Sequence, residues 1–311
     1  MKQLYDIIVI GGGPGGFTAA LYAARAGLQV IVLEKLSAGG QMALTSKIDN
    51  YPGFPDGVDG FALGESMEQQ AQRYGAETEL TEVLRTDLSG PVKTVETPEG
   101  TYRGRSVIFA TGAGHKPLGL PGEQTFAGRG IHYCAACDGM LYRNKTVVVV
   151  GGGNSAAADA LALSRIAGKV ILVHWRDTLR ATKIYHEPLK NAPNVEFIWN
   201  AVVTGLEGDA RLTGITVQDV YTGQTARIPC DGVFISIGRS PASALAAGQL
   251  ELDAAGYIVA DESTQTSLPG VFAVGDVRTK ALRQVVTAVA DGAVAAHHAE
   301  LFLAENNFSM Q

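Results

Sequence analysis

Cysteine is scarce in this sequence, with three residues among 311. Three cysteines in a chain of this length do not make the disulfide framework of a small secreted protein. A secretory signal is also missing, because no basic start, apolar run and small-residue cleavage site precede the first apolar segment at about Tyr5. No apolar run reaches the ~18 residues that a membrane-spanning helix needs. We therefore expect a cytoplasmic protein that does not enter a membrane.

The sequence also lacks an excess of positive charge. Its net charge of -6 argues against nucleic-acid binding as the main task. Hydrophobic residues make up 46% and charged residues 18%, which is typical of soluble globular proteins. A length of 311 residues suggests about two domains. Glycine is abundant, at 38 residues, and many of these glycines fall in nucleotide-loop patterns.

The most informative feature is a pair of cysteines separated by two residues, Cys134 and Cys137, with Asp138 directly after them. This spacing suits a disulfide that opens and closes. A thiolate in such a pair has a lowered pKa and can attack another disulfide. The Asp138 carboxylate could exchange protons with the leaving thiolate. The pair indicates redox catalysis, and an inert pair or half of a zinc site are the alternatives.

The zinc alternative has few ligands to draw on. A zinc site of the usual kind needs about four Cys or His ligands at matched spacing. His132 is a nearby candidate, but a fourth ligand is missing, and Cys230 is far away in sequence. We therefore expect no metal site, and we interpret Cys230 as a core residue outside the redox couple.

A dinucleotide-binding pattern opens the chain. The apolar run Asp6–Ile10 predicts a buried parallel strand, and a helix is predicted over Pro14–Arg25. Between them, three glycines fill the G-x-G-x-x-G pattern: Gly11, Gly13 and Gly16. A second strand, predicted over Gln29–Leu33, ends at Glu34, whose carboxylate can accept ribose hydroxyls. We prefer this interpretation to a glycine-rich turn in some other α/β protein.

A second pattern of the same kind follows the cysteines. The apolar run Thr146–Val150 predicts a strand, and a helix is predicted from the loop to about Ile166. The loop has the G-x-G-x-x-A form and holds Gly151, Gly153, Asn154, Ser155 and Ala156. The chain is therefore predicted to hold two dinucleotide sites.

The second unit differs from the first in the residues after its second strand. No acid follows Val170–Val173; a turn with Trp175, Arg176 and Arg180 stands there instead. Basic residues at this point suit a 2′-phosphate, so a phosphorylated nicotinamide cofactor is suggested. A solvated basic turn is the alternative. Trp175 could stack on adenine or simply pack.

The remaining segments predict an alternation of helices and strands. We expect a helix over Phe61–Gly75 and a closing helix over Arg283–Asn306, in which Gly292 permits close approach. An apolar strand ends at Gly275 and Asp276, which would put a carboxylate beside the sugar chain of a cofactor. Further strands are predicted over 79–102, 106–110, 195–206, 212–220, 225–228 and 233–237. The tail is expected to fold back on the first unit.

These motifs, in this order, resemble those of the low-molecular-weight thioredoxin reductases, and the resemblance covers nearly the whole chain. The CxxC motif lies inside the second unit, whereas larger disulfide reductases carry a CxxxxC motif in the first domain. Besides the cysteines with Asp138 and the two glycine-rich loops, the resemblance rests on Glu34, Gln41, Ala110, Thr111, Gly112, Gly275, Asp276, Arg283 and Gln284.

The resemblance implies an α/β fold of two Rossmann-like domains, the second inserted into the first. Residues 1–115 and 243–311 would form a discontinuous FAD-binding domain. Residues 116–242 would form an NAD(P)H-binding domain that carries the CxxC motif. The resemblance also implies a homodimer and a large rotation between the domains.

The resemblance further implies the cofactor sites and the reaction. FAD would be held at Gly11, Gly13, Gly16, Glu34, Gln41, Asn50 and Asp276, and NADPH or NADH by the second unit. Electrons would pass from the nicotinamide to FAD, then to the Cys134–Cys137 disulfide and on to thioredoxin or a thioredoxin-like protein. Cys137 would face the flavin, Cys134 would attack thioredoxin, and Asp138 would be the acid and base.

One position departs from the family pattern. The NADPH enzymes of the family carry His-Arg-Arg-x-x-x-Arg, whereas here Trp175 replaces the first arginine. Loss of one charge-assisted contact should cost about 1.5–3 kcal/mol of NADPH binding. We therefore expect a weakened preference for NADPH over NADH.

Two other functions stay open. The first is a flavin-disulfide reductase that takes its electrons from ferredoxin or another electron protein. The second is a flavin-binding redox sensor without turnover.

Overall fold

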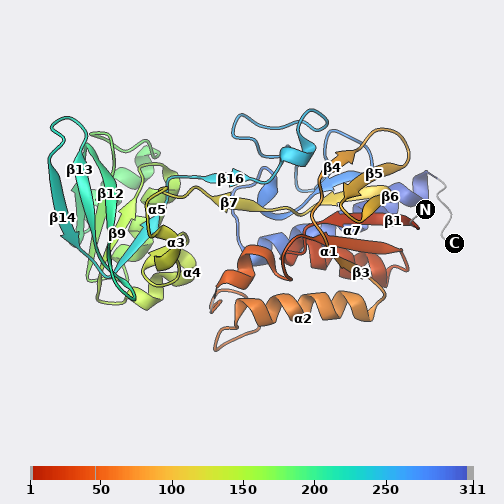
Figure 1. Cartoon of the computed structure of the whole chain (residues 1–311), viewed down its shortest axis with the longest axis horizontal. Helices are drawn as coiled ribbons and strands as arrows, with labels where there is room; N and C mark the ends of the chain where they lie inside the picture. Colours follow the sequence, from red (N-terminus) through yellow and green to blue (C-terminus); the bar gives the residue numbers. More distant parts are fainter. Residues whose placement is uncertain (1–2, 46, 307–311) are drawn as a thin grey trace. The chain divides into compact units, whose positions relative to one another are not determined.

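The computed structural model describes residues 3–45 and 47–306. The chain divides into two compact units, residues 1–114 with 240–311 and residues 115–239. The boundaries expected from the sequence followed residues 115 and 242, so the observed ones differ from them by one and three residues. The first unit is thus made of two separate stretches of chain (Figure 1).

The first unit is built on a mixed seven-stranded sheet. Its strands lie in the order β3-β2-β1-β6-β5-β4, and β17 pairs with β6. Strand β1 pairs in parallel with β2 and β6, β2 with β3, and β6 with β17, whereas β4 and β5 are antiparallel to their neighbours. The apolar side chains of β1, β2, β17 and the end of β6 are buried in two core clusters, as is typical of parallel strands covered on both faces. The strands are β1 (Leu4–Ile10), β2 (Val30–Glu34), β3 (Glu77–Leu80), β4 (Arg85–Asp87), β5 (Lys93–Thr97), β6 (Gly100–Phe109) and β17 (Val271–Ala273).

The described residues of this unit form three α-helices: α1 (Pro14–Arg25), α2 (Gly60–Arg73) and α7 (Val285–Glu305). Helices α1 and α7 lie side by side (Figure 1), and a Cβ atom on Gly292 of α7 would overlap with the carbonyl oxygen of Gly15 in α1. Glycine at this position therefore allows the two backbones to touch, as the sequence predicted. Short 3-10 turns cover Gly40–Leu44, Ala244–Ala246 and Gly275–Val277.

Strand β17 belongs to the second stretch of the first unit and pairs with β6 of the first stretch. Val271, Phe272 and Ala273 pair in parallel with Val107–Phe109 of β6. The three residues of β17 are buried in the same core clusters as β1 and β6. The prediction that the tail folds back on the first unit is confirmed.

The second unit contains a parallel five-stranded sheet in the order β11-β10-β9-β15-β8. Its helices are α3 (Glu123–Phe126), α4 (Ala135–Asp138), α5 (Asn154–Ser164) and α6 (His186–Asn191), with 3-10 turns at Gly139–Tyr142 and Lys183–Tyr185. The strands are β8 (Ile131–His132), β9 (Thr146–Val150), β10 (Lys169–Val173), β11 (Val195–Ile198) and β15 (Gly232–Ile235). The prediction of two Rossmann-like units in an α/β chain is confirmed.

A small antiparallel sheet completes the second unit. It contains β12 (Ala201–Gly208), β13 (Leu212–Asp219) and β14 (Thr225–Pro229). The single strand predicted over 195–206 is wrong, because β11 ends at Ile198 and the chain turns at Asn200, which has a φ of 54°. Its two halves join different sheets, since a left-handed residue cannot continue an extended strand.

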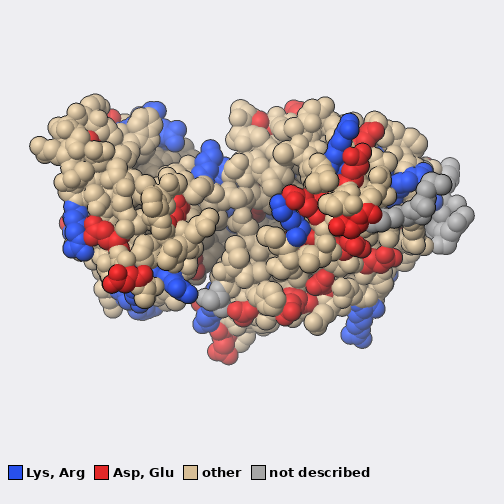
Figure 2. Space-filling model, viewed as in Figure 1, with Lys and Arg blue, Asp and Glu red and all other residues tan. Residues whose placement is uncertain are grey.

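Two short strands, β7 (Ala113–His115) and β16 (Arg239–Pro241), pair where the chain passes between the units. Among the described residues, no helix is both long and apolar enough to cross a membrane. On the face drawn in Figure 2, acidic and basic side chains are interspersed and form no continuous basic stripe. This surface agrees with a net charge of -6.

Candidate active site

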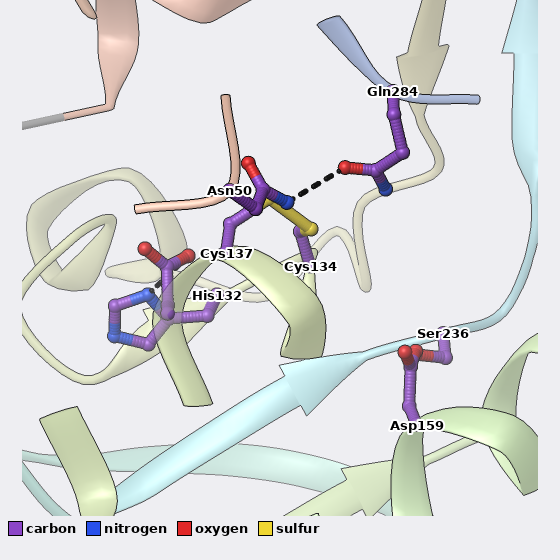
Figure 3. Close-up of a disulfide and its surroundings, with 8 residues drawn as sticks. Asn50, His132, Cys134, Cys137, Asp159, Ser236 and Gln284 are labelled. Atoms are coloured by element: carbon purple, nitrogen blue, oxygen red, sulfur yellow. Dashed lines mark hydrogen bonds and ion pairs between the residues drawn. A yellow bond between two sulfur atoms is a disulfide. The ribbon is translucent and has the colours of Figure 1, made fainter. Parts of the chain in front are cut away.

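The two cysteines predicted to be redox-active form a disulfide, Cys134–Cys137 (Figure 3). Cys134 is the N-cap of the short helix α4, and its carbonyl oxygen accepts hydrogen bonds from the backbone N–H groups of Cys137 and Asp138. Residues three apart on one helical turn lie on the same face, so the turn brings the two sulfur atoms together. Both cysteines are partly exposed, which leaves the disulfide open to a reaction partner.

Asp138, the expected acid and base, contacts a buried histidine. Nδ1 of His132 lies 3.0 Å from Oδ2 of Asp138. The opposite ring nitrogen, Nε2, lies 2.7 Å from the hydroxyl oxygen of Tyr142. The His132 side chain is 5% exposed and that of Asp138 is 23% exposed. His132, which the sequence offered as a possible metal ligand, thus uses both ring nitrogens in hydrogen bonds.

A second carboxylate, that of Asp159, contacts helix α4, which carries the disulfide. Asp159 on α5 accepts a 2.5 Å hydrogen bond from the hydroxyl of Ser236 (Figure 3). It accepts another from the backbone N–H of Ala135, the first residue of α4. Burial raises the pKa of Asp159, and these two donors and Arg239 oppose that shift. Asp159 therefore ties α4 to α5 and to the residue after β15.

The third cysteine is separate from this site. Cys230 is a buried free thiol in a cluster of apolar side chains. Burial raises the pKa of this thiol to about 12, so it holds no thiolate at neutral pH. The prediction that Cys230 is a core residue is confirmed. Among the described residues, no group of three or more His, Cys, Asp or Glu could hold a metal ion.

The first glycine-rich loop has the geometry that its pattern predicts. Gly11 has a φ of 106°, and a Cβ atom on Gly16 would overlap with the carbonyl oxygen of Gly11. Gly13 differs, because nothing lies within 4 Å of the position that its Cβ would take. Glu34 accepts a 2.6 Å hydrogen bond from the backbone N–H of Gly12. The loop is packed at Gly11, Gly12 and Gly16 and open at Gly13, where a pyrophosphate could approach.

The other candidate FAD residues of the first unit occupy loops. Asn50 donates a 2.9 Å hydrogen bond to Oε1 of Gln284 (Figure 3), which precedes α7. The hydroxyl of Thr111 donates to the carbonyl oxygen of Ala242. Gln41 is exposed in the 3-10 turn after Gly39. These contacts join loops that are far apart in the sequence.

The end of the first unit adds the remaining candidates. Gly275 and Asp276 lie in the 3-10 turn after β17. The Arg283 guanidinium lies 4.1 Å from the centre of the Tyr257 ring, and its NH2 group donates to the carbonyl oxygen of Arg278. Ala110 and Gly112 lie directly after β6. In open α/β sheets of this kind, ligands bind beside the carboxyl ends of the parallel strands.

The second glycine-rich loop repeats the first. Gly151 has a φ of 142°, and its Cβ would overlap with the carbonyl oxygen of Ser236. Gly153, like its counterpart, has nothing within 4 Å of its Cβ position. The side chain of Asn154 accepts a 2.8 Å hydrogen bond from the backbone N–H of Thr182, and Ser155 is exposed. Ala156 is fully buried and packs α5 on the sheet.

The basic turn after β10 carries two exposed arginines, Arg176 and Arg180. The Arg176 guanidinium lies 4.2 Å from the centre of the Trp175 ring, and Trp175 is 50% exposed. His174 is buried, and neither of its ring nitrogens has a hydrogen-bond partner among the described residues. Burial, Arg180 and Arg176 lower the pKa of His174, which favours the neutral imidazole. Trp175 is thus stacked with a cation and not packed in the core.

Sequence reasoning missed four side chains around the disulfide. They are Tyr142, Asp159 and Ser236, and His132 in its contact with Asp138. For two of these residues, the sequence offered their positions as a signal. Ser236 follows an apolar strand, and Asp159 lies on the helix after the second glycine-rich loop. Neither signal distinguishes a site residue from an ordinary surface residue.

Comparisons with known proteins agree with this geometry. The pyridine nucleotide-disulphide oxidoreductase family matches residues 5–292. The thioredoxin reductase of Treponema pallidum is 43% identical over 303 residues, which cover 97% of this chain and 98% of that protein. The chain belongs to the low-molecular-weight thioredoxin reductases. This family membership confirms the expected class of enzyme, an oxidoreductase that uses a disulfide, and it implies FAD and a pyridine nucleotide as cofactors.

Two further members of the thioredoxin reductases support this assignment. The thioredoxin reductase of Streptomyces clavuligerus is 45% identical over 307 residues, covering 98% of this chain and 95% of that protein. The crystal structure of thioredoxin reductase from Streptococcus pyogenes has a TM-score of 0.90 and 40% identity, covering 97% of this chain and 99% of that one. The family fold therefore extends over nearly the whole chain.

Proposed function

We propose that the protein reduces the disulfide of thioredoxin or a thioredoxin-like protein with electrons from NADPH or NADH. The observation that carries this proposal is the Cys134–Cys137 disulfide on α4, partly exposed and followed by Asp138. The relatives named thioredoxin reductase support thioredoxin as the substrate.

The two glycine-rich loops fit dinucleotide cofactors. Both Gly13 and Gly153 leave open the space that a Cβ would fill, and each stands at the start of a helix whose N-terminal N–H groups favour phosphate. When bound, FAD would supply two-electron reduction of the disulfide, and the nicotinamide would supply the hydride that restores the flavin. The residues proposed to hold FAD are Gly11, Gly13, Gly16, Glu34, Gln41, Asn50, Ala110, Thr111, Gly112, Gly275, Asp276, Arg283 and Gln284.

The thiol chemistry is carried by the chain's own residues. The Cys134 thiolate attacks one sulfur of the substrate disulfide, forms a mixed disulfide and releases the other sulfur as a thiolate. The Cys137 thiolate then attacks the Cys134 sulfur, closes the Cys134–Cys137 bond and releases the second substrate thiolate. Asp138 takes the proton from the Cys137 thiol and returns it to a departing thiolate. One disulfide is formed for each one broken.

The nicotinamide site is proposed to accept both nucleotides. Arg176 and Arg180 are exposed and could contact a 2′-phosphate, but the Arg176 guanidinium lies over Trp175. A neutral indole in place of a guanidinium removes one charge-assisted contact, so the preference for NADPH over NADH is relaxed. The residues proposed to hold the nucleotide are Gly151, Gly153, Asn154, Ser155, Ala156, Trp175, Arg176 and Arg180.

An anaerobic titration of the flavin-loaded protein tests the electron donor. We expect both NADPH and NADH to bleach the flavin absorbance, with similar efficiency. If neither nucleotide bleaches it while reduced ferredoxin does, the protein is a reductase fed by an electron protein, and the nicotinamide proposal is wrong.

Cysteine variants test the disulfide route. We expect Cys134→Ser and Cys137→Ser each to abolish thioredoxin-dependent reduction of insulin, whereas Cys230→Ala should retain it. A wild-type protein that binds flavin but shows no turnover with any thioredoxin would instead indicate a redox sensor.

Assembly and location follow from the same proposal. We propose a homodimer, as the family resemblance implies, and sedimentation equilibrium tests it by the measured mass. We propose a cytoplasmic location because reduced nicotinamide nucleotides are supplied there. Cell fractionation with an antibody against the chain would contradict this location by finding the protein in another compartment.

A further inference from the structure

The imidazole of His132 lies between two groups that can each form a hydrogen bond with it. Its Nδ1 is 3.0 Å from Oδ2 of Asp138, and its Nε2 is 2.7 Å from the hydroxyl oxygen of Tyr142. The ring is also held on its flat face, where it stacks on Phe234 with 5.4 Å between ring centres. Strand β8 fixes the backbone, because His132 pairs with Phe234 of β15. The ring is therefore oriented by contacts on three sides.

Two protonation states satisfy every hydrogen bond of this group. In the first, neutral His132 donates from Nδ1–H to the Asp138 carboxylate, and the Tyr142 hydroxyl donates to Nε2. In the second, one more proton is present on Nε2, Nε2–H donates to the Tyr142 oxygen, and Nδ1–H still donates to the Asp138 carboxylate. Only the Tyr142 hydroxyl has to rotate between the two states. The heavy atoms can stay in place.

The tyrosine can serve in both states because it keeps its own proton. Burial raises the pKa of Tyr142 to about 12; Arg211 opposes this shift, while Asp138, Asp231 and Cys230 add to it. The Lys145 ammonium lies 5.5 Å from the centre of the Tyr142 ring. The titratable groups that contact His132 directly are Asp138 and Tyr142. The Tyr142 hydroxyl is thus neutral, and it can either donate a hydrogen bond to Nε2 of His132 or accept one from it.

We propose that His132 positions Asp138 through Nδ1–H and, when protonated at Nε2, stabilises the carboxylate form of Asp138, so that the charge of the imidazole tunes the acid–base group beside Cys137. This inference rests on the proposed function, in which Asp138 exchanges a proton with the thiols. When the Asp138 carboxyl gives its proton to a departing thiolate, Nδ1–H of His132 donates to the carboxylate that remains. When the carboxylate takes a proton from the Cys137 thiol, that proton stays on Asp138 and the imidazole keeps its own. Asp138 returns each proton that it takes up, so the exchange balances.

The variant that separates the two parts of this role is His132→Asn. An asparagine amide N–H can occupy the place of Nδ1–H and still hold Asp138, but it cannot take up a proton. His132→Ala removes both the contact and the proton. Tyr142→Phe keeps the aromatic packing and removes only the partner of Nε2. His297→Asn on the exposed surface of α7 is the matched control.

The main measurement is the rate at which iodoacetamide alkylates Cys137 between about pH 5 and 9 in the Cys134→Ser background, read by mass spectrometry. It needs neither cofactor nor thioredoxin. We expect two inflections with His132 present, because a neighbouring imidazole that gains or loses charge alters the reactivity of the thiol. We expect a single inflection in His132→Asn and no change in His297→Asn.

Tyr142→Phe provides the second, independent test. A charged imidazolium donates a stronger hydrogen bond to the tyrosine oxygen than the neutral ring accepts from it. Loss of the hydroxyl therefore disfavours the protonated ring, and the lower inflection should move to lower pH by about half a unit. This variant keeps the proposal testable if His132→Asn does not fold.

Turnover of thioredoxin provides the link to function. In His132→Asn we expect kcat to fall about tenfold, with KM for thioredoxin unchanged, since an acid–base partner affects the chemical step. Identical alkylation profiles for wild type, His132→Asn and Tyr142→Phe would overturn the inference, even if thioredoxin is reduced. Altered profiles without any thioredoxin turnover would leave the inference standing and contradict the proposed function.

Discussion

The backbone N–H of Gly275 donates a 2.8 Å hydrogen bond to Oδ2 of Asp291, sixteen residues further along the chain. The same carboxylate accepts hydrogen bonds from the guanidinium of Arg278 and from the ammonium of Lys280. The three charged side chains are at most 9% exposed. Asp291 therefore fastens the loop after β17, which holds the candidate cofactor residue Asp276, to helix α7.

Replacement of Asp291 by asparagine should strongly destabilise the first unit. It leaves two buried cations without their carboxylate, which typically costs about 3–5 kcal/mol. Burial alone would raise the pKa of Asp291, but hydrogen bonds from Arg278 and Lys280 lower it below the ordinary value. The carboxylate thus stabilises the fold above the unfolded pKa of ~3.9, and this contribution is lost as the pH falls through the native pKa.

Urea unfolding of wild type and Asp291→Asn at pH 7 and near pH 3 measures this contribution. The gap between the two midpoints should be large at pH 7 and smaller in acid. Glu305→Gln, at the exposed end of α7, is the control and should match wild type. A gap that is independent of pH would refute the charge argument.

Asp159 should show the opposite dependence on pH. Burial raises its pKa in the folded protein, so the folded state binds more protons than the unfolded state above pH ~4. The stability of wild type therefore falls as the pH rises through this range, and Asp159→Asn should remove that fall. Thermal melts between pH 4 and 7 give the slope for each protein. A steeper slope in Asp159→Asn than in wild type would contradict the assignment.

Two glycines of the first loop should respond differently to alanine. Gly16→Ala places a methyl group against the carbonyl oxygen of Gly11, so we expect a loss of stability of about 1–3 kcal/mol or more. Gly13→Ala adds a methyl group to open space, so its stability without cofactor should change by no more than about 0.5 kcal/mol. Its affinity for FAD should nevertheless fall. Chemical unfolding of the apoprotein and flavin titration measure the two effects separately, and unchanged FAD affinity in Gly13→Ala would contradict the proposed role of the loop.

Replacement of Trp175 by arginine should increase the preference for NADPH. One additional charge-assisted contact with a 2′-phosphate is worth about 1.5–3 kcal/mol, or at least a tenfold change. The ratio of kcat/KM for NADPH to that for NADH should rise accordingly. Trp175→Phe removes the indole without adding charge, and its ratio should stay near that of wild type. Equal ratios in Trp175→Arg and wild type would show that residue 175 does not contact the nucleotide phosphate.

Much of the fold could be predicted because its signals are local. The apolar run at the start of the chain, the glycines at 11, 13 and 16 and the alanine-rich helices each specify a strand, a turn or a helix through their own sterics and burial. The strand predicted over 195–206 failed for the same reason. Its apolar pattern continues through Asn200, and nothing in the pattern shows that this residue adopts a left-handed conformation.

The sequence by itself determined the order of the two nucleotide loops, the position of the redox cysteines between them and the family of the protein. Only the tertiary structure decided which side chains surround these motifs. His132 meets Tyr142, Asp159 meets Ser236, and Asp291 meets Arg278 because strands and helices pack side by side. Such contacts depend on the register of packed elements, which a linear pattern of residue types does not record.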